Sequence, residues 1–278
     1  MERVSEWATS LPSPRLRPFI EQYVGYRYLG FEPGTHRGLP SRHATFIVSI
    51  GPSIDVAQQT DADQAPARYR TVLSGLQATS ALITHSGDQE GVTIKPTPLG
   101  FRSLFAMPVR ALWSTSIELA DVAGSVADEL WERMQGTTTW PERFSLCDEV
   151  LGRLATGDAS LPPELHEAWT GLVASGGTAS VADLARRVGW SRQHLARRFG
   201  DEFGLGPKLA GRVVRFERAR RMLESTPSFV TLAQVAAACG YYDQSHLNRD
   251  FLELAGCSPT TWMAEELPSF QDDAAVPV

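Results

Sequence analysis

The sequence predicts an α+β protein, with a mostly-β N-terminal domain flanked by helices and an all-α C-terminal domain. Three observations support this fold class. Short β-branched segments separated by Gly, Ser and Pro fill residues 1 to about 110. From about residue 116 onward, apolar residues recur at helical spacing. The last hundred or so residues contain an internal repeat. The length of 278 residues leaves room for about two domains.

The strand predictions rest on β-branched and apolar segments that end at turn residues. The strongest is residues 43–50, which Gly51 and Pro52 follow. The polar stretch 58–66 is predicted to be a loop. Several short strands with turns between them indicate a small sandwich or barrel. The other predicted strands are residues 69–74, 81–84 and 91–96.

Two helices are predicted at the end of the N-terminal domain. Val126, Leu130 and Met134 recur at helical spacing in the first, and the second begins at Trp140-Pro141. The Gly-, Ser- and Pro-rich residues 156–163 are predicted to form a linker. The resulting divisions are residues 1–155 for the N-terminal domain, 164–267 for the C-terminal domain and 268–278 for a flexible tail.

The overall composition indicates a cytoplasmic protein. No apolar run reaches the roughly 18 residues of a membrane-spanning helix. The charged first ten residues lack the apolar core of a secretion signal. Cys147, Cys239 and Cys257 are far apart and odd in number, which argues against a disulfide framework and a four-ligand zinc site. We expect no membrane partner, no metal and no cofactor.

The charge of the chain is unevenly distributed. The net charge is −6, although residues 186–221 hold eleven basic and three acidic side chains, a formal +8 that leaves −14 for the rest. An acidic body with one basic segment is typical of a regulator with a separate DNA-binding part, because phosphates attract Lys and Arg. A solvated arginine-rich helix face is an equally simple interpretation of the charge alone.

The internal repeat is the strongest signal. His-Leu-x-Arg-x-Phe, followed by a Gly and a Pro, occurs over residues 194–207 and again over 246–259, with six identities at a constant offset of 52. Each copy follows a short apolar helix that ends at Gly189 or Gly240, the residue type favoured for a left-handed helix cap. Two helices joined by a tight turn at Gly form a helix-turn-helix unit.

The repeated residues divide into a core face and a polar face. The Leu and Phe of each repeat lie four positions apart and are predicted to be buried. On the other face, Arg can pair with guanine, and Gln or Asn with adenine, in the major groove. For the two histidines, packing or capping and DNA contact both remain open. The predicted DNA-binding residues are Ser191, Arg192, Gln193, His194, Arg197 and Arg198 in the first unit, and Gln244, Ser245, His246, Asn248 and Arg249 in the second.

A long helix is predicted to join the two units. Residues 207–224 contain an apolar stripe and would form a helix roughly 27 Å long. Such a strut would separate the two reading helices by about one turn of B-DNA, roughly 34 Å, so that one chain enters two successive major grooves. The stripe consists of Leu209, Val213, Phe216, Ala219 and Leu223.

These motifs resemble the DNA-binding domain of the AraC/XylS family of transcription regulators. The resemblance rests on residues 189–199, 240–251 and 256–262 and covers about residues 164–264. It implies seven helices, operator or promoter DNA as a partner and RNA polymerase as a further one. It also implies base contacts by Arg192, Gln193 and Arg197 and by Gln244, Ser245, His246 and Arg249.

The N-terminal part resembles the cupin-like sensing domains of the same family, best over residues 91–96 and 100–108. This implies binding of an unknown small-molecule effector, dimerisation, or both. His36, Arg37, Arg42 and His43 lie on a predicted loop before a strand and are the candidates for binding an anionic or carboxylate effector. A plain surface loop is the alternative. Metal binding is disfavoured because no His-x-His spacing occurs.

Two other functions are alternatives to a regulator. The first is an enzyme, either a cupin-like catalytic domain or a cysteine alkyl-acceptor, fused to a DNA-binding tail. The chain contains no P-loop, no GxSxG and no paired-carboxylate motif, so we expect no enzyme activity. The second is a non-specific architectural DNA-binding protein, against which the base-reading residue types argue. Activation and repression are both compatible with the sequence.

The second unit is poor in positive charge. Residues 224–265 contain one basic and five acidic side chains, a formal −4. Phosphate attraction is therefore expected mainly from the first unit. We predict that the first unit supplies most of the DNA affinity and most of its salt dependence.

Overall fold

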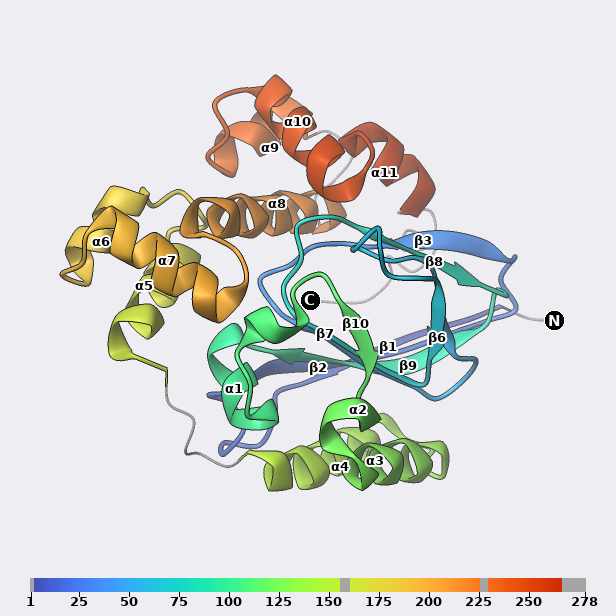
Figure 1. The fold of residues 1–278 in the computed structure, drawn as a ribbon. Coiled ribbons are helices and arrows are strands. Elements are labelled where there is room, and N and C mark those ends of the chain that lie inside the picture. The colour runs from blue at the N-terminus through green and yellow to red at the C-terminus, as the bar shows by residue number, and fades with distance from the viewer. Residues whose placement is uncertain (1–2, 156–160, 226–229, 267–278) are drawn as a thin grey trace.

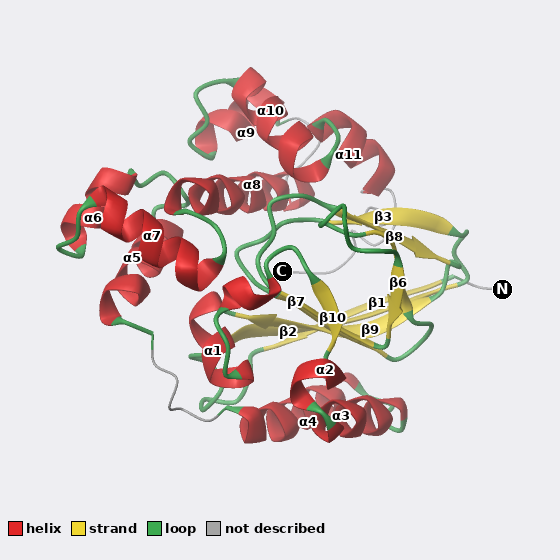
Figure 2. Cartoon of the chain, in the orientation of Figure 1, coloured by secondary structure: helices red, strands yellow, loops and turns green. Residues whose placement is uncertain are grey.

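The computed structural model describes residues 3–155, 161–225 and 230–266. Two antiparallel sheets face each other in the N-terminal part, two helices cover the outer face of the larger sheet, and the C-terminal helices lie on the other side of the molecule (Figures 1 and 2). The predicted tail and most of the predicted linker lie outside the described residues. Within the described ranges, no helix is both long and apolar enough to cross a lipid bilayer.

The larger sheet has six strands in the order β1-β2-β9-β4-β7-β10, and the smaller has four in the order β3-β8-β5-β6. Phe46 lies opposite both Ile94 and Leu73, and all three side chains are completely buried, so the centre of the larger sheet forms the core of the sandwich. The strands are β1 Val4–Ser10, β2 Ile20–Leu29, β3 Gly34–Gly38, β4 Thr45–Ser49, β5 Ile54–Gln58, β6 Ala67–Tyr69, β7 Thr71–Ser74, β8 Ala81–His85, β9 Gln89–Pro96 and β10 Ser116–Glu118.

The segment around residue 36 differs from its prediction. Gly34–Gly38 was expected to be a loop, but it forms β3 and pairs with Ala81–His85. Its glycines and polar side chains favour a turn, and the backbone hydrogen bonds to β8 override that local preference. β1 and β2 were also missed, because charged side chains such as Arg27 break the apolar alternation; Arg27 forms an ion pair with Glu6 on the neighbouring strand.

Helices close the N-terminal part. Trp140 of α4 lies against β2 so closely that a side chain at Gly25 would meet its ring at 2.3 Å, which explains a glycine in the middle of that strand. The two predicted helices are α3 and α4, and the second is capped by Thr139 and Glu142. The elements are α1 Pro98–Phe105, the 3-10 helix η1 Val109–Leu112, α2 Ala120–Ala123, α3 Ser125–Gln135 and α4 Trp140–Leu154.

The C-terminal part contains seven helices within the described residues, as the resemblance implies. α6 and α7 form the first helix-turn-helix unit, α9 and α10 the second, and the long α8 joins them. Both turns contain a glycine in the left-handed region, Gly189 at φ +71° and Gly240 at φ +77°. The helices are α5 Pro163–Ala174, α6 Val181–Arg187, α7 Arg192–Phe203, α8 Pro207–Ser225, α9 Leu232–Ala238, α10 Gln244–Ala255 and α11 Pro259–Glu266.

The hydrophobic core crosses the predicted domain boundary. One cluster of buried side chains runs from Leu16 through the sandwich and the helices α3 and α4 to Leu195, Phe199 and Ala210. A second cluster joins the far half of α8 to the second unit. The first unit therefore shares a continuous core with the N-terminal part, whereas the second unit has a core of its own.

Candidate DNA-binding surface

The reading helix of the first unit, α7, is held by its buried face. Ser191 caps the helix by accepting a hydrogen bond from the His194 N–H at 3.1 Å. Leu195 and Phe199 are completely buried, and the Phe199 ring lies 5.8 Å from that of Trp169 on α5. Burial of these two apolar residues leaves the opposite face to solvent. The exposed side chains on it are Arg192, Gln193, Arg197 and Arg198.

The reading helix of the second unit, α10, repeats this construction with a different cap. Asp243 takes the place of the serine and accepts from the His246 N–H at 2.7 Å. Leu247 and Phe251 are buried, and Phe251 packs on Phe216 of α8 with ring centroids 4.8 Å apart. The exposed side chains are Gln244, Ser245 and Arg249, while Asn248 is half-buried.

Both histidines pack on an aromatic side chain of the preceding turn. The His194 ring meets the Trp190 ring edge-on at 4.6 Å, and its Nδ1 lies 3.3 Å from an Arg197 nitrogen. His246 meets Tyr241 in the same way at 5.2 Å. Their half-buried rings thus help to hold the turns in place. Direct contact with DNA by either histidine stays a proposal.

Nearby carboxylates form ion pairs with nearly half of the basic side chains in residues 186–221. Five of the eleven cations form ion pairs, namely Arg186, Arg187, Arg212, Arg220 and Arg221. No ion pair to a carboxylate occurs, within the described residues, at Arg192, Arg197, Arg198, Lys208, Arg215 and Arg218. Half of this second group lies on α7. The positive charge that remains available for phosphates is therefore concentrated on and beside the first reading helix.

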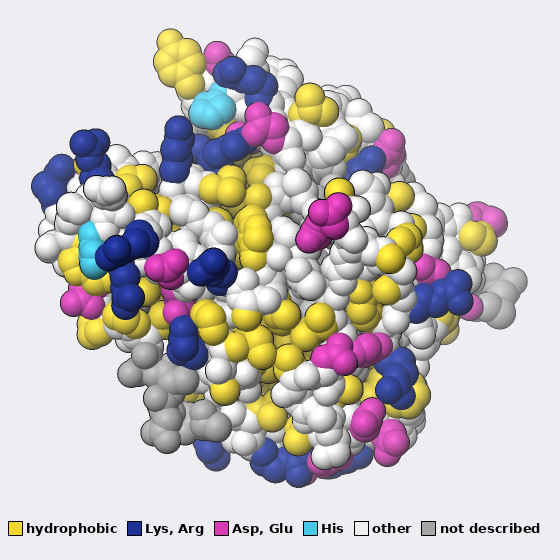
Figure 3. Space-filling view, viewed as in Figure 1, with side chains coloured by type: hydrophobic (Ala, Val, Ile, Leu, Met, Phe, Trp, Pro, Cys, Tyr) yellow, Lys and Arg dark blue, Asp and Glu magenta, His cyan; other side chains and the backbone are white. Residues whose placement is uncertain are grey.

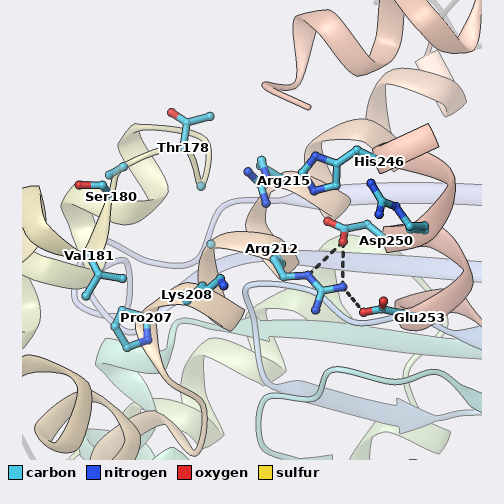
Figure 4. Close-up of a pocket in the computed structure, with 14 residues that line it drawn as sticks. Thr178, Ser180, Val181, Pro207, Lys208, Arg212, Arg215, His246, Asp250 and Glu253 are labelled. Atoms are coloured by element: carbon cyan, nitrogen blue, oxygen red, sulfur yellow. Dashed lines mark hydrogen bonds and ion pairs between the residues drawn. The ribbon is translucent and has the colours of Figure 1, made fainter. Parts of the chain in front are cut away.

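A basic groove lies between the two units. It has a volume of about 680 Å³ and is lined by the start of α6, the first half of α8 and one face of α10 (Figure 4). Asp250 and Glu253 hold the Arg212 guanidinium, the former at 2.8 Å. Lys208, Arg215 and Arg249 line the same groove without a carboxylate partner among the described residues. In Figure 3, basic side chains gather along the edge formed by α6, α7 and α10.

The segment that leads into the first unit touches the turn of the second unit directly. A side chain at Gly240 would meet Thr178 Cγ2 at 2.5 Å, and one at Gly177 would meet the Gly211 carbonyl oxygen at 2.2 Å. The segment before α6 is thus wedged between α8 and the turn of the second unit. This packing, together with the strut α8, fixes the relative positions of the two reading helices.

Tyr242 is a surface residue that the sequence reasoning did not select. Its side chain is 93% exposed and stands in the turn just before α10. From the turn glycine to the repeated histidine there are five steps in the first unit (Gly189 to His194) and six in the second (Gly240 to His246). Tyr242 occupies the extra position. Comparing the spacing of the two turns would have revealed it.

The four candidate effector residues do not line one site. His36 and Arg37 line a cavity of about 560 Å³ between the sandwich and the C-terminal helices. Arg42 and His43 instead bind Glu21, at 2.6 and 2.9 Å, and the Arg42 backbone N–H donates to Glu217 of α8 at 2.9 Å. The hydrogen bond from His43 lowers the pKa of Glu21 to about 2. This pair thus joins the N-terminal part to α8.

The three cysteines, which are the candidates for a catalytic nucleophile, are buried. Burial raises the pKa of the Cys147 thiol, and it also raises that of Cys239 and Cys257. A nucleophilic cysteine needs the opposite shift and access to solvent. Within the described ranges, no three His, Cys, Asp or Glu side chains are grouped as metal ligands.

Comparison with known proteins supports the helix-turn-helix assignment. Residues 184–265 match the family model described as a helix-turn-helix domain. A curated HTH-type transcriptional regulator of Mycobacterium tuberculosis is 36% identical over 85 residues, which cover 31% of this chain and 32% of that protein. The match thus spans about a third of the relative's length.

The fold of the whole chain is similar to that of ToxT from Vibrio cholerae. One ToxT structure aligns with a TM-score of 0.51 at 12% identity, over 95% of this chain and 99% of that chain. Another, of ToxT bound to (E)-4-(8-methylnaphthalen-1-yl)but-3-enoic acid, aligns with a TM-score of 0.51 at 11% identity over the same shares of the two chains. At this identity the likeness establishes the fold.

Proposed function

We propose that this chain, whose residues 184–265 match a helix-turn-helix domain model, is a sequence-specific DNA-binding transcription regulator of the AraC type. α7 and α10 enter two successive major grooves, with the strut α8 between them. One observation carries the proposal: both reading helices bury their Leu and Phe and leave arginine and amide side chains exposed. These side chains are the types that recognise guanine and adenine.

The site residues follow from this arrangement. We assign base contacts to the exposed side chains of the two reading helices and phosphate contacts to the unpaired cations of the groove. Ser191 directs the start of α7 toward DNA. Tyr242 adds a contact beside α10, because an exposed tyrosine there lies next to the base-reading side chains. DNA contacts by the half-buried His194, His246 and Asn248 also belong to the proposal, and the two histidines pack on the turns as well.

The N-terminal domain is proposed to bind a small-molecule effector. The shared fold supports this, since one ToxT structure contains a bound naphthalenyl butenoic acid. A homodimer, a contact with RNA polymerase and a place in the cytoplasm also belong to the proposal. The buried thiols give no support to a cysteine-dependent enzyme.

Selection of binding sites from a random duplex library tests the function. The full chain is expected to enrich one motif with two half-sites about one helical turn apart. Competition between the enriched duplex and a shuffled duplex of equal length, at fixed salt, then measures specificity, for which we expect at least about a thousandfold preference. Equal binding of both duplexes would instead identify a non-specific architectural protein.

A further inference from the structure

We propose that Tyr242 determines specificity in the second unit by packing its ring on the 5-methyl group of a pyrimidine, thymine or 5-methylcytosine, in the major groove. This contact deepens the proposed function and rests on it, because it requires that α10 reads bases. The second unit then recognises its half-site partly through an apolar contact, which needs no positive charge.

Two adjacent tyrosines in the turn before α10 have opposite environments. Tyr241 is buried, and its ring meets that of His246 edge-on at 5.2 Å, as Trp190 meets His194 in the first unit. Tyr241 therefore supplies the aromatic packing that each turn contains. Tyr242 is 93% exposed, and its ring meets no other ring among the described residues. This second ring is thus available to a partner outside the chain.

The backbone of Tyr242 is held in place although its side chain is exposed. Its N–H donates a hydrogen bond to Nδ1 of His246 at 3.4 Å. The next residue, Asp243, caps α10 by accepting from the His246 N–H at 2.7 Å. A side chain carried by an ordered turn loses less conformational freedom on binding than one carried by a flexible loop. The turn therefore presents the ring in a defined position.

Tyr242 stands at the leading end of the second reading helix. It lies two positions before Gln244, the first residue of α10, and the N-terminal residues of a reading helix are those that reach base edges. His246, which accepts from the Tyr242 backbone, also lines the basic groove between the two units (Figure 4). The exposed ring therefore borders the proposed DNA-binding surface.

The groups beside Tyr242 favour a base over a phosphate. Asp243 is exposed and acidic, and its carboxylate would repel a phosphate placed close to this turn. Gln244 and Ser245, which follow on the exposed first turn of α10, carry no charge. An aromatic ring gains most from apolar contact. The major groove offers that contact at the 5-methyl group of thymine, which the other unmodified bases lack.

Single replacements of thymine by deoxyuridine in the selected duplex test the contact on the full chain. Deoxyuridine keeps the hydrogen-bonding groups of thymine and lacks only the methyl group. For the parent protein, at least one replacement is expected to weaken binding about threefold to fivefold, the loss expected for one buried methyl group. For Tyr242→Ala, the same replacement is expected to change the affinity less than about 1.5-fold, because the methyl group has then lost its partner. Fluorescence anisotropy at fixed salt measures all four affinities.

Two control variants separate the ring from other effects. Tyr242→Phe keeps the ring and is expected to retain the full effect of the methyl group. Leu11→Ala shortens another exposed apolar side chain, in the N-terminal domain, and is expected to retain it as well. The inference is overturned if the parent protein shows no methyl effect, if the effect persists in Tyr242→Ala, or if it disappears in either control.

A further pair of duplexes distinguishes the two sources of the methyl group. The sensitive thymine is replaced by cytosine in one duplex and by 5-methylcytosine in the other, each paired with guanine. If the methylated duplex binds the parent protein about threefold to fivefold more tightly, and Tyr242→Ala binds both equally, the ring reads the methyl group on either base. Equal binding by the parent protein restricts the contact to thymine, for which the inference then stands.

The library selection separates this inference from the proposed function. Enrichment of one motif without a methyl effect that depends on Tyr242 overturns the contact alone. Failure to enrich any motif overturns the regulator, and the contact with it.

Discussion

The two helix-turn-helix units share a backbone plan and differ in what surrounds them. The first unit is part of the core that extends from the sandwich, and Arg102 of α1 holds its buried Glu202 at 2.5 Å. The second unit has a separate core and meets the N-terminal part at the end of α10, whose Ala255 carbonyl accepts from Ser80 at 3.1 Å, and through the following α11, where Arg37 binds Glu266 at 3.2 Å. A repeated motif thus specifies a local fold twice, while its neighbours determine how each copy is held.

The units also differ in charge at the DNA-facing surface. α7 presents three arginines without a carboxylate partner among the described residues, whereas α10 presents Arg249 beside an acidic cap and two acidic side chains, Asp250 and Glu253. Phosphate attraction scales with the number of available cations. We therefore expect the first unit to supply most of the DNA affinity, and the second to read bases with little electrostatic help.

Substitution of the two turn glycines is expected to produce the largest difference between the units, in the free energy of unfolding. Gly240→Ala is expected to destabilise the protein by about 2–4 kcal/mol, because a left-handed residue gains strain and its Cβ meets Thr178. Gly189→Ala, with nothing within 4 Å, is expected to cost only the strain, about 1–2 kcal/mol. Urea unfolding of the full chain measures both.

A double variant sharpens this result. Thr178→Ser removes the obstructing methyl group, so the Gly240→Ala/Thr178→Ser protein is expected to regain the stability of Gly189→Ala. If Gly240→Ala and Gly189→Ala are equally stable, the contact between the two units has no energetic weight.

Substitution of the arginines on the two reading helices is expected to produce the next largest difference, in DNA affinity. Arg197→Ala is expected to weaken binding to the selected duplex by about 1–3 kcal/mol, roughly fivefold to 150-fold, since the proposed bidentate contact to guanine is lost. Arg249→Ala is expected to have a smaller effect, because neighbouring carboxylates already offset its charge. Fluorescence anisotropy at fixed salt provides both affinities, and a larger loss for Arg249→Ala would reverse the roles of the units.

Tyr242 tests whether the longer second turn contributes to binding. Its exposed side chain makes little contribution to folding, so Tyr242→Ala is expected to leave the melting temperature unchanged. The same change should weaken duplex binding by about 1 kcal/mol, roughly fivefold. Tyr242→Phe distinguishes the hydroxyl from the ring. An affinity within twofold of the parent for both variants would exclude this residue from the interface.

The smallest expected effect concerns Glu253. Glu253→Gln removes one of the two carboxylates that hold Arg212, and a surface ion pair contributes only about 0–1 kcal/mol to stability. Arg212 remains paired with Asp250, but the loss of the Glu253 charge leaves more positive charge for a phosphate, so the log–log salt slope of DNA binding should become steeper by up to about one. Binding measured over a salt series tests this, with Glu129→Gln on α3 as the control. An unchanged slope would mean that Arg212 does not reach a phosphate.

Much of the C-terminal part was predictable because its signals are local. Gly189 and Gly240 end their helices, Ser191 caps the next one, and Leu195 and Phe199 define a buried face by spacing alone. The candidate DNA-binding side chains come from the same periodicity. Nothing local indicated β3, whose residues become a strand only by pairing with β8.

Helix periodicity, caps and turns act over a few residues, so the amino-acid sequence alone predicts the twin helical units, the strut between them and the residue types on their outer faces. The tertiary structure adds which arginines lack a carboxylate partner among the described residues, and that Arg42 and His43 pair with Glu21 and contact α8. These contacts join residues that are far apart in the sequence, 175 positions in the case of Arg42 and Glu217, and neighbouring residues carry no signal for them.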